Sequence, residues 1–268
     1  MTKRIVILGP NGMLGQNVNK YFSPDNEIIL FNMRYSQNAR KEFLSALQNY
    51  EPEVIINCIG KIPQKTSTFE DLFVANALLP LELNAAFDDT VIIHPSTDCV
   101  FSSDKKEPNN SFDAPNAQDE YGLSKIYGEL SGVLRANTFI IRSSIIGLTD
   151  GYKSEGLLDW FMRQDESVPI NGYTNHIWNG VTAFEWCGLA EQLIFDPPTE
   201  KQSGIIQIGS KTPVSKYELL TSAKDIFSKK IDIIPLETSS AVNRVLNPKV
   251  QIESVAVQLK RYWDWLGH

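Results

Sequence analysis

Short apolar runs rich in β-branched residues recur along the first half of the chain, separated by longer amphipathic stretches. Such runs predict strands that are buried on both faces of a sheet, and the stretches between them predict helices. The expected strands cover residues 4–8, 28–31, 54–59, 91–95 and 138–142. The expected helices cover residues 12–22, 39–49, 69–87 and 119–135. Strands alternating with helices predict βαβ units, a parallel sheet and right-handed crossovers.

After Gly147 the alternation becomes less regular. Helices are expected at 155–165, 182–195 and 215–228, with short strands near 168–170, 205–208 and 231–235. We therefore expect an α/β protein: a Rossmann-type, doubly wound parallel sheet over residues 1–147 and a small C-terminal α/β lobe over 148–268, partly interleaved with it. The polar segment 102–118 has two open interpretations, a solvent-exposed connector and a flap over a ligand.

Composition narrows the class of protein. The chain has 268 residues, of which 42% are hydrophobic and 21% charged, which suits one sizeable core with a small lobe attached. The net charge of −7 argues against a nucleic-acid binder that depends on a basic surface. No run approaches the ~18 apolar residues of a membrane span, and the N-terminus leads into a strand without a signal-peptide pattern. We expect a cytoplasmic protein with neither nucleic acid nor membrane as partner.

Cysteine and histidine show no metal-site spacing. Cys58, Cys99 and Cys187 lie far apart and form no Cys-x-x-Cys pair, and the three histidines are scattered. Metal sites built from these residues need closer spacings. We expect neither a bound metal nor a thiol nucleophile.

A glycine-rich turn follows the first expected strand. Gly9 permits a tight turn, Gly12 lets the backbone approach a pyrophosphate, and Gly15 lets the next helix pack close to the strand. The N-terminus of that helix would face the negative charge of the ligand. Although the spacing is G-x-x-G-x-x-G and not the more common G-x-G-x-x-G, the strand–turn–helix context predicts a dinucleotide site.

The end of the second expected strand bears on which dinucleotide binds. An Asp or Glu there would bind the ribose 2′-hydroxyl of NAD, but the sequence is Phe-Asn-Met-Arg over 31–34. Arg34 is able to pair with a 2′-phosphate, which favours NADP over NAD. The alternative is a surface arginine and tolerance of either cofactor.

The segment Tyr121-Gly-Leu-Ser-Lys125 carries the candidate chemistry. A Tyr four residues before a Lys places both side chains on one face of a helix, where the ammonium is expected to lower the pKa of the phenol. Thr97, at the end of a neighbouring strand, would supply a hydrogen bond to the same reacting oxygen. Because adjacent strand residues face opposite sides, only one of Ser96 and Thr97 can serve. The set predicts proton transfer to a carbonyl oxygen while a nicotinamide transfers hydride.

Six motifs follow one another along the chain: Gly9-x-x-Gly12-x-x-Gly15, Asn57-Cys-Ile-Gly60, Val74-Ala-Asn-Ala77, Ser96-Thr-Asp-Cys-Val-Phe101, Tyr121-x-x-x-Lys125 and Arg142-Ser-Ser144. In this order they resemble the motifs of the extended short-chain dehydrogenases/reductases. Among these enzymes the chain resembles the dTDP-4-dehydrorhamnose reductase branch, for which Ser-Thr-Asp-x-Val-Phe before the Tyr is distinctive.

The resemblance implies roles for individual residues. Thr97, Tyr121 and Lys125 would be catalytic. Contacts to the cofactor would come from Gly9, Asn11, Gly12, Met13, Leu14, Gly15, Arg34, Cys58, Ile59, Gly60, Asn76, Tyr121 and Lys125. Contacts to the substrate would come from Thr97, Asp98, Tyr121, His176, Trp178 and Arg244. For Arg142 two interpretations are open, a buried pair with an acid and a ligand contact.

The resemblance also implies an activity: NADPH-dependent reduction of the 4-keto group of a nucleotide-activated 6-deoxy sugar, in polysaccharide or secondary-metabolite synthesis. Two alternatives are an epimerase or dehydratase acting on a nucleotide sugar, and a non-catalytic NADP-binding regulatory subunit. The chain departs from the branch at Val245, where Pro is usual, and at Ile145-Ile146, near a usual Trp. A monomer or a homodimer is expected.

Overall fold

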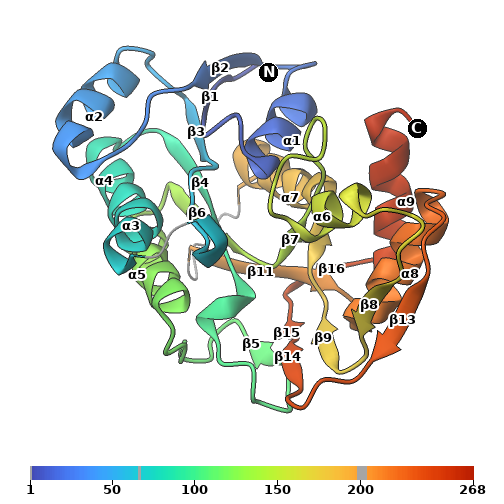
Figure 1. Cartoon of the computed structure of the whole chain (residues 1–268). Coiled ribbons are helices and arrows are strands. Elements are labelled where there is room, and N and C mark those ends of the chain that lie inside the picture. The colour runs from blue at the N-terminus through green and yellow to red at the C-terminus, as the bar shows by residue number, and fades with distance from the viewer. Residues whose placement is uncertain (1, 66–67, 198–203) are drawn as a thin grey trace.

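The computed structural model describes residues 2–65, 68–197 and 204–268, and it shows a central parallel sheet with helices on both faces (Figure 1). Among the described residues seven strands form this sheet, in the order β16-β11-β6-β4-β3-β1-β2. Their bounds are β1 Arg4–Leu8, β2 Glu27–Phe31, β3 Val54–Asn57, β4 Val91–Ser96, β6 Thr138–Arg142, β11 Ile205–Ser210 and β16 Val250–Ile252. The expected Rossmann-type sheet is confirmed.

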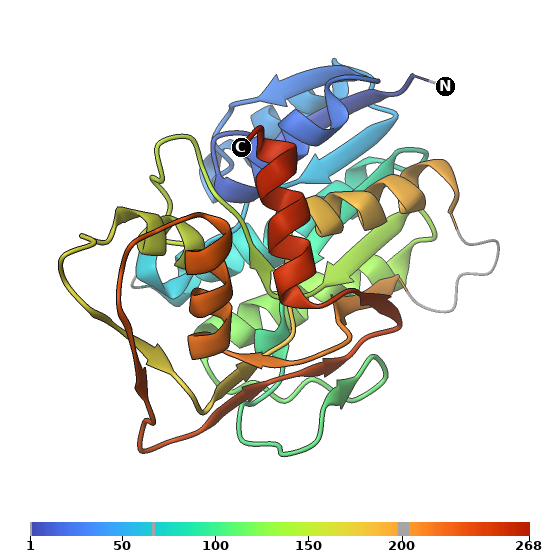
Figure 2. The ribbon, with the colours of Figure 1, turned by 90° about the vertical axis from the view of Figure 1, so that its right-hand side faces the viewer.

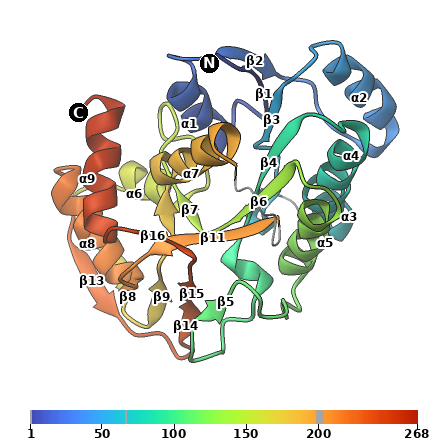
Figure 3. The same cartoon turned by 180° about the vertical axis from the view of Figure 1, so that it is seen from behind.

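Two layers of helices sandwich the sheet. Seen from the front and from behind, α2 to α5 lie on one side and α1, α7 and α9 on the other (Figures 1 and 3). The helices are α1 Met13–Phe22, α2 Arg40–Gln48, α3 Phe69–Phe73, α4 Leu79–Ala86, α5 Glu120–Leu134, α6 Leu157–Arg163, α7 Ala183–Phe195, α8 Lys216–Ile226 and α9 Val255–Leu266. A π-helical segment, Val74–Leu78, joins α3 to α4, and short 3₁₀ turns cover Gln37–Ala39, Pro63–Lys65 and Asp98–Val100.

Alternate residues of each central strand enter the two cores. In β1, Ile5 and Ile7 join the core beneath α1 and α7, whereas Val6 and Leu8 join the one beneath α2 and α4. All four are fully buried, which explains why the strand is a continuous apolar run. Each such side chain contributes about 1.5–3 kcal/mol of hydrophobic free energy.

Nine shorter strands in the described residues build the rest of the molecule, and β5, β9, β14 and β15 gather at the lower end of Figure 1. Their bounds are β5 Asn109–Asn110, β7 Ile145–Ile146, β8 Ile170–Tyr173, β9 His176–Trp178, β10 Val181–Thr182, β12 Val214–Ser215, β13 Ile233–Leu236, β14 Val242–Arg244 and β15 Leu246–Asn247. β11 and β16 come from beyond Gly147, so the central sheet is completed by the last third of the chain.

The C-terminal helix α9 lies between α8 and α7 (Figure 2). Its Tyr262 is fully buried, and the hydroxyl accepts a hydrogen bond from the backbone N–H of Leu148 (2.7 Å) and donates to Oδ1 of Asn17 in α1 (2.8 Å). The end of the chain is thereby joined to the first helix. This helix was not among those expected from the sequence.

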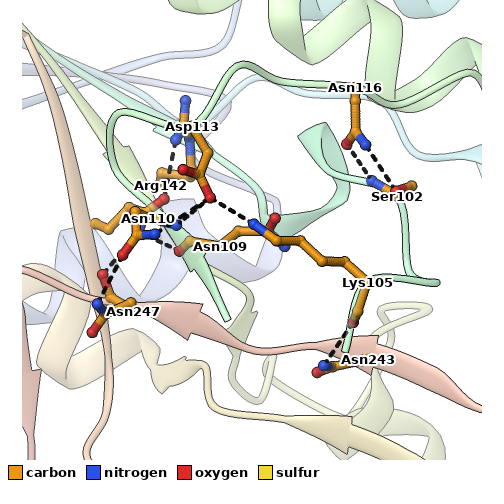
Figure 4. A network of polar contacts seen from close by, with 10 residues as sticks. Ser102, Lys105, Asn109, Asn110, Asp113, Asn116, Arg142, Asn243 and Asn247 are labelled. Carbon is orange, nitrogen blue, oxygen red and sulfur yellow. Dashed lines mark hydrogen bonds and ion pairs between the residues drawn. The ribbon is translucent and has the colours of Figure 1, made fainter. Parts of the chain in front are cut away.

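The segment 102–118 is held against the strands β14 and β15 (Figure 4). Asn243 donates from its side-chain amide to the carbonyls of Lys105 and Lys106, and Asn247 donates to Asn110 (2.8 Å). Asp113 accepts hydrogen bonds from Asn110 and pairs with Lys105. The connector therefore has a defined structure, fastened to the C-terminal part of the chain.

Within the described residues, no helix is long and apolar enough to cross a membrane. In the same part of the chain no three His, Cys, Asp or Glu side chains are grouped as a metal would need. All three cysteines are described, and each is free.

Candidate functional site

Four of the sequence motifs follow neighbouring strands of the sheet. Gly9 follows β1, Gly60 comes shortly after β3, Thr97 follows β4, and Arg142 ends β6. Since β1, β3, β4 and β6 are consecutive and parallel, these positions share the carboxyl edge. The chain order reverses across β1, with β2 on one side and β3 on the other, and ligands of doubly wound sheets bind at such a point.

The glycine-rich turn brings α1 very close to β1. Gly9 has φ +69°, a left-handed conformation that favours glycine. A Cβ on Gly15 would lie 2.2 Å from the carbonyl oxygen of Gly9, so only glycine fits there. Gly12 caps α1 without a side chain, which leaves the first N–H groups of the helix free to face an anion. The turn fits the pyrophosphate of a dinucleotide.

A cavity of about 280 Å³ adjoins this turn, and none of the described residues that line it carries a carboxylate. Arg34 lines it, is exposed, and makes no hydrogen bond or ion pair with any described residue. Its lining is Gly9, Pro10, Asn11, Gly12, Phe31, Asn32, Met33, Arg34, Tyr35, Ile59, Gly60, Lys61 and Ala75. Arg34 also lines a neighbouring cavity of about 410 Å³, where Lys61 pairs with Asp71. The first cavity fits the adenosine part of a dinucleotide, with a cation beside it.

Some residues expected at the cofactor have a different place. Leu14 is buried in the core, and Met13 and Cys58 pack against that core, so their side chains do not line the cavity beside the turn. Burial raises the pKa of the Cys58 thiol. Leu14 is therefore a core residue, whereas the side chains of Met13 and Cys58 are only partly buried.

Asn76, expected at the cofactor, positions two other elements. It sits in the π-helical segment and is fully buried. Its Oδ1 accepts from the backbone N–H of Lys61 (2.9 Å), and its Nδ2 donates to the Lys61 carbonyl (2.9 Å) and to Oγ of Ser124 (3.0 Å). Because both ends of the amide are engaged, Asn76 joins the loop after β3 to helix α5.

The candidate catalytic residues meet where β4 ends and α5 begins. Thr97 interacts with the phenol of Tyr121, and its hydroxyl also donates to Oδ1 of Asp98 (3.1 Å). Asp119 caps α5 by accepting from the N–H of Gly122 (2.9 Å), which fixes the turn that carries Tyr121. Ser96 is excluded from this role because its hydroxyl donates to buried Glu129.

Lys125 lies one helical turn beyond Tyr121 and is 6% exposed. Its ammonium donates to the carbonyl of Pro95 (3.2 Å) and lies 3.7 Å from the place that a Cβ on Gly60 would take. Burial lowers the pKa of the Lys125 ammonium to about 8, although the nearby carboxylate of Glu129 acts to raise it. At neutral pH it is mainly cationic.

The pKa of Tyr121 shifts in the direction opposite to the sequence-based expectation. Burial raises it, and neighbouring Cys99 and Asp98 add to the rise, whereas the hydrogen bond with Thr97 lowers it. Desolvation thus outweighs the effects that favour the phenolate. The phenol is protonated at neutral pH, which is the state a general acid needs.

Asp98 lies beside these groups and is 4% exposed. Burial raises the pKa of its carboxyl, while the charges of Arg244 and Lys216 lower it. Two cations from the C-terminal part of the chain therefore face the end of β4.

Arg142 forms a buried structural pair. Its guanidinium donates to both oxygens of Glu129 (2.8 and 2.6 Å) and to Oε1 of Gln207 (3.0 Å). Arg142 is 1% exposed. Of the two interpretations offered by the sequence, the ion pair is confirmed.

The three substrate candidates from the C-terminal part of the chain, His176, Trp178 and Arg244, lie at different places in the structure. His176 lines a cavity of about 500 Å³, and Arg244 lines another of about 370 Å³ while donating to the carbonyl of Phe101 (2.6 Å). The expectation that Trp178 contacts the substrate is corrected, because Trp178 is 2% exposed and belongs to the core. The ammonium of Lys216 lies 5.0 Å from the centre of its ring. The start of α8 covers this part of β9.

Sequence reasoning missed Lys61 and Lys216. Lys61 lines both cavities beside the glycine-rich turn. Lys216 is the first residue of α8, where the helix dipole disfavours a cation. A lysine at the start of an expected helix could therefore have been recognised from the sequence as a candidate site residue.

Comparison with known proteins gives the family and the fold of the chain. Residues 3–167 match the family model described as RmlD substrate binding domain. Over 289 aligned residues the chain is 26% identical to methionine adenosyltransferase 2 subunit beta of Danio rerio, with 96% of this chain and 84% of that protein covered.

Solved structures share the fold. The dTDP-4-dehydrorhamnose reductase of Bacillus anthracis in complex with NADP superposes with a TM-score of 0.84 at 20% identity, covering 98% of this chain and 99% of that one. The RMD protein of Pseudomonas aeruginosa complexed with NADPH gives 0.76 at 15% identity, covering 99% and 98%. On the family match over residues 3–167, the chain belongs to the RmlD substrate binding domain family, within the extended short-chain dehydrogenases/reductases.

Proposed function

We propose that the protein is an NADPH-dependent reductase of the 4-keto group of a nucleotide-activated 6-deoxy sugar. The observation that carries the proposal is the meeting of Thr97, Tyr121 and Lys125 at the sheet edge that also holds the glycine-rich turn. The family match and the fold shared with dTDP-4-dehydrorhamnose reductases support it.

The cofactor site supports NADP over NAD. Arg34 lies on the wall of a cavity without carboxylates and has no protein partner among the described residues, so its charge is available to a 2′-phosphate. When bound, the nicotinamide would supply the hydride that reaches the carbonyl carbon.

Side chains of the protein would supply the proton and stabilise the charges that form during the transfer. Tyr121, kept protonated by burial, would give its proton to the carbonyl oxygen as negative charge develops there. Thr97 would donate a hydrogen bond to the same oxygen. Lys125, cationic and buried beside the strand ends, would stabilise the phenolate left behind.

We place the substrate on the C-terminal side of these residues, in a lobe that uses much of 148–268. Its support is the position of Lys216 and Arg244, whose charges face Asp98. We place the reaction in the cytoplasm, since all three cysteines are free, as in a reducing compartment. We also propose that the protein is a monomer or a homodimer.

NADPH oxidation against dTDP-, UDP- and GDP-4-keto-6-deoxy sugars, each generated by its dehydratase, tests the proposal. Tyr121→Phe should lower kcat about 10²- to 10⁴-fold, because it removes the proton donor while keeping the ring. Tyr127→Phe, on an exposed residue of the same helix, is the matched control and should keep full activity.

A second candidate function is a cofactor-binding subunit of another enzyme, and the likeness to a protein named as a beta subunit favours it. Under this alternative the wild-type protein would bind NADPH and reduce none of the sugars. Reduction of any one of them that is lost in Tyr121→Phe would exclude it.

A further inference from the structure

Helix α5 carries a buried carboxylate one turn beyond Lys125. Glu129 is 3% exposed, and its side chain lies on the same helical face as that of Lys125, four residues earlier. Both side chains reach β4. The ammonium donates to the carbonyl of Pro95 (3.2 Å), and the carboxylate accepts from the hydroxyl of Ser96 (2.6 Å). The proton transfer proposed above does not use this acid, so its burial beside the lysine needs another explanation.

Three hydrogen bonds fix the Glu129 carboxylate. Arg142 of β6 donates from Nε to Oε1 (2.8 Å) and from Nη2 to Oε2 (2.6 Å), and Ser96 of β4 supplies the third bond. Arg142 also donates to Oε1 of Gln207 in β11 (3.0 Å), whose amide nitrogen donates to two backbone carbonyls. Three consecutive strands of the central sheet thus hold the acid. An unpaired carboxylate would be costly in this place, and these partners stabilise its charged form.

The groups around the Lys125 ammonium make Glu129 its main support. Burial disfavours the ammonium, and Glu129 acts most strongly in the opposite direction by raising the pKa of Lys125. Cys99, after β4, also acts to raise it, but burial raises the pKa of that thiol to about 12, so the thiol is uncharged at neutral pH. His94 of β4 is neutral as well, because burial and the charge of Lys125 lower its pKa. Tyr121 is a protonated phenol, and the π-helical segment carries no titratable side chain.

Charged side chains on the remaining neighbouring elements are engaged with other partners. Lys61, in the loop after β3, forms an ion pair beside the second cavity. Asp98, after β4, faces the cations of the C-terminal part of the chain. Arg142 of β6 is bound to Glu129 itself. Glu129 is therefore the carboxylate that the fold places against the catalytic ammonium.

We propose that Glu129, held by Arg142, is a positioning residue that keeps Lys125 cationic for the proton transfer. This inference rests on the proposed function and deepens it, because it names the group that sustains the charge needed beside the Tyr121 phenolate. Glu129 would act through the lysine and would touch neither substrate nor cofactor. Without its carboxylate, burial would release the proton of Lys125 closer to neutral pH, and the phenolate would lose its counter-charge.

The test replaces the buried ion pair by neutral pairs of similar volume, which are often tolerated, whereas loss of one partner alone leaves a buried charge unpaired. Glu129→Gln/Arg142→Gln keeps polar groups able to form hydrogen bonds, and Glu129→Met/Arg142→Met does not. NMR of the full chain, labelled at the lysine ε-carbon, follows the titration of Lys125. Its signal is assigned by its loss in Lys125→Met, and thermal melts show that the double variants fold.

We expect the pKa of Lys125 to fall from about 8 to about 7 or lower in both double variants, because an opposite charge nearby has been removed. The high-pH limb of kcat for NADPH oxidation should move to lower pH by the same amount, since activity is lost where Lys125 gives up its proton. Asp159→Asn is the matched control. This carboxylate of α6 is also fully buried and accepts from Thr149, so the variant should lose stability while the Lys125 titration stays unchanged.

A Lys125 pKa that stays at about 8 in either double variant would overturn the inference. A fall confined to the Met pair would assign the effect to hydrogen bonding, and an equal fall in Asp159→Asn would assign it to lost stability. Failure of both double variants to fold would show that the pair serves the fold instead. The reductase is judged separately. A fall in the pKa without reduction of any sugar refutes only the reductase, whereas reduction with an unmoved Lys125 titration refutes only the role of Glu129.

Discussion

Burial sets the charge state of individual residues at the site. The phenol of Tyr121 stays neutral because desolvation penalises the phenolate, and the same effect brings the pKa of Lys125 down to about 8. A neutral acid beside a cation suits reduction of a ketone, where the acid must start with its proton. The reverse oxidation would need the phenolate, which this environment disfavours.

Lys125 should make stability depend on pH in the cofactor-free protein. Between its folded pKa of about 8 and its ordinary value of 10.5, the unfolded chain holds a proton that the folded chain lacks, so stability rises with pH. The contribution grows to about 3 kcal/mol across this window. In urea unfolding between pH 8 and 10.5, the wild type should gain stability relative to Lys125→Met, by an amount that approaches this value. Parallel curves would contradict the prediction.

Arg34 should decide between the two dinucleotides. Replacing it with Ser removes the cation from the cavity beside the glycine-rich turn. NADPH should then bind about 10- to 100-fold more weakly, the loss of a charged hydrogen bond, while NADH binding stays the same. Fluorescence titration measures both, with Lys41→Ser, an exposed lysine outside that cavity, as control. Equal loss for both cofactors would show that Arg34 does not contact a 2′-phosphate.

At the scale of elements, the site depends on how closely α5 approaches the π-helical segment. Gly128 faces the carbonyl oxygen of Asn76, and a Cβ there would lie 2.1 Å from it. The same Asn76 holds the loop after β3 and Ser124 of α5. The contact therefore fixes the helix that presents Tyr121 and Lys125.

Gly128→Ala should force α5 away from this segment. We expect a loss of about 1–3 kcal/mol in the free energy of unfolding, as for other overpacked sites, together with weaker catalysis. Gly188→Ala in α7 is the matched control, because its Cβ would meet only the Tyr21 hydroxyl at 3.8 Å. There alanine should stabilise by up to about 1 kcal/mol through helix propensity. Thermal melts that rank the two variants the other way would disprove the account.

The sequence predicted the elements whose signals are local. The β-branched runs, the turn at Gly9 and the Tyr121–Lys125 spacing all carry their own geometry, and the corresponding strands and helices are confirmed. The π-helical segment was not expected, because the hydrogen bonds of Asn76 come from distant parts of the chain. The expectation that Trp178 contacts the substrate was wrong for a similar reason, since only the folded chain shows that α8 covers this side chain.

The helix α9 could have been predicted. Val255, Leu259, Tyr262 and Leu266 follow a helical spacing, and Gly267 ends the helix in the left-handed conformation. The short strands could not have been predicted in this way. β16, for example, has only three residues and owes its conformation to pairing with β11.

For the whole molecule, the hydrogen bonds of Tyr262 join the last helix to the first. Tyr262→Phe leaves the N–H of Leu148 and Oδ1 of Asn17 without this buried partner. We expect a loss of about 1–3 kcal/mol, measured by chemical unfolding. Tyr50→Phe, exposed and without a hydrogen bond to any described residue, should cost almost nothing. Similar small effects for both would show that the buried hydroxyl is dispensable.

The position of β16 at one edge of the central sheet has a consequence for synthesis of the protein. A ribosome releases β1 to β6 early, yet β11 and β16 emerge only after residues 210 and 252. Until then the flank of β6 lacks its neighbouring strands, and such surfaces recruit chaperones or aggregate. The nascent chain should therefore stay sensitive to protease until α9 has emerged from the ribosome.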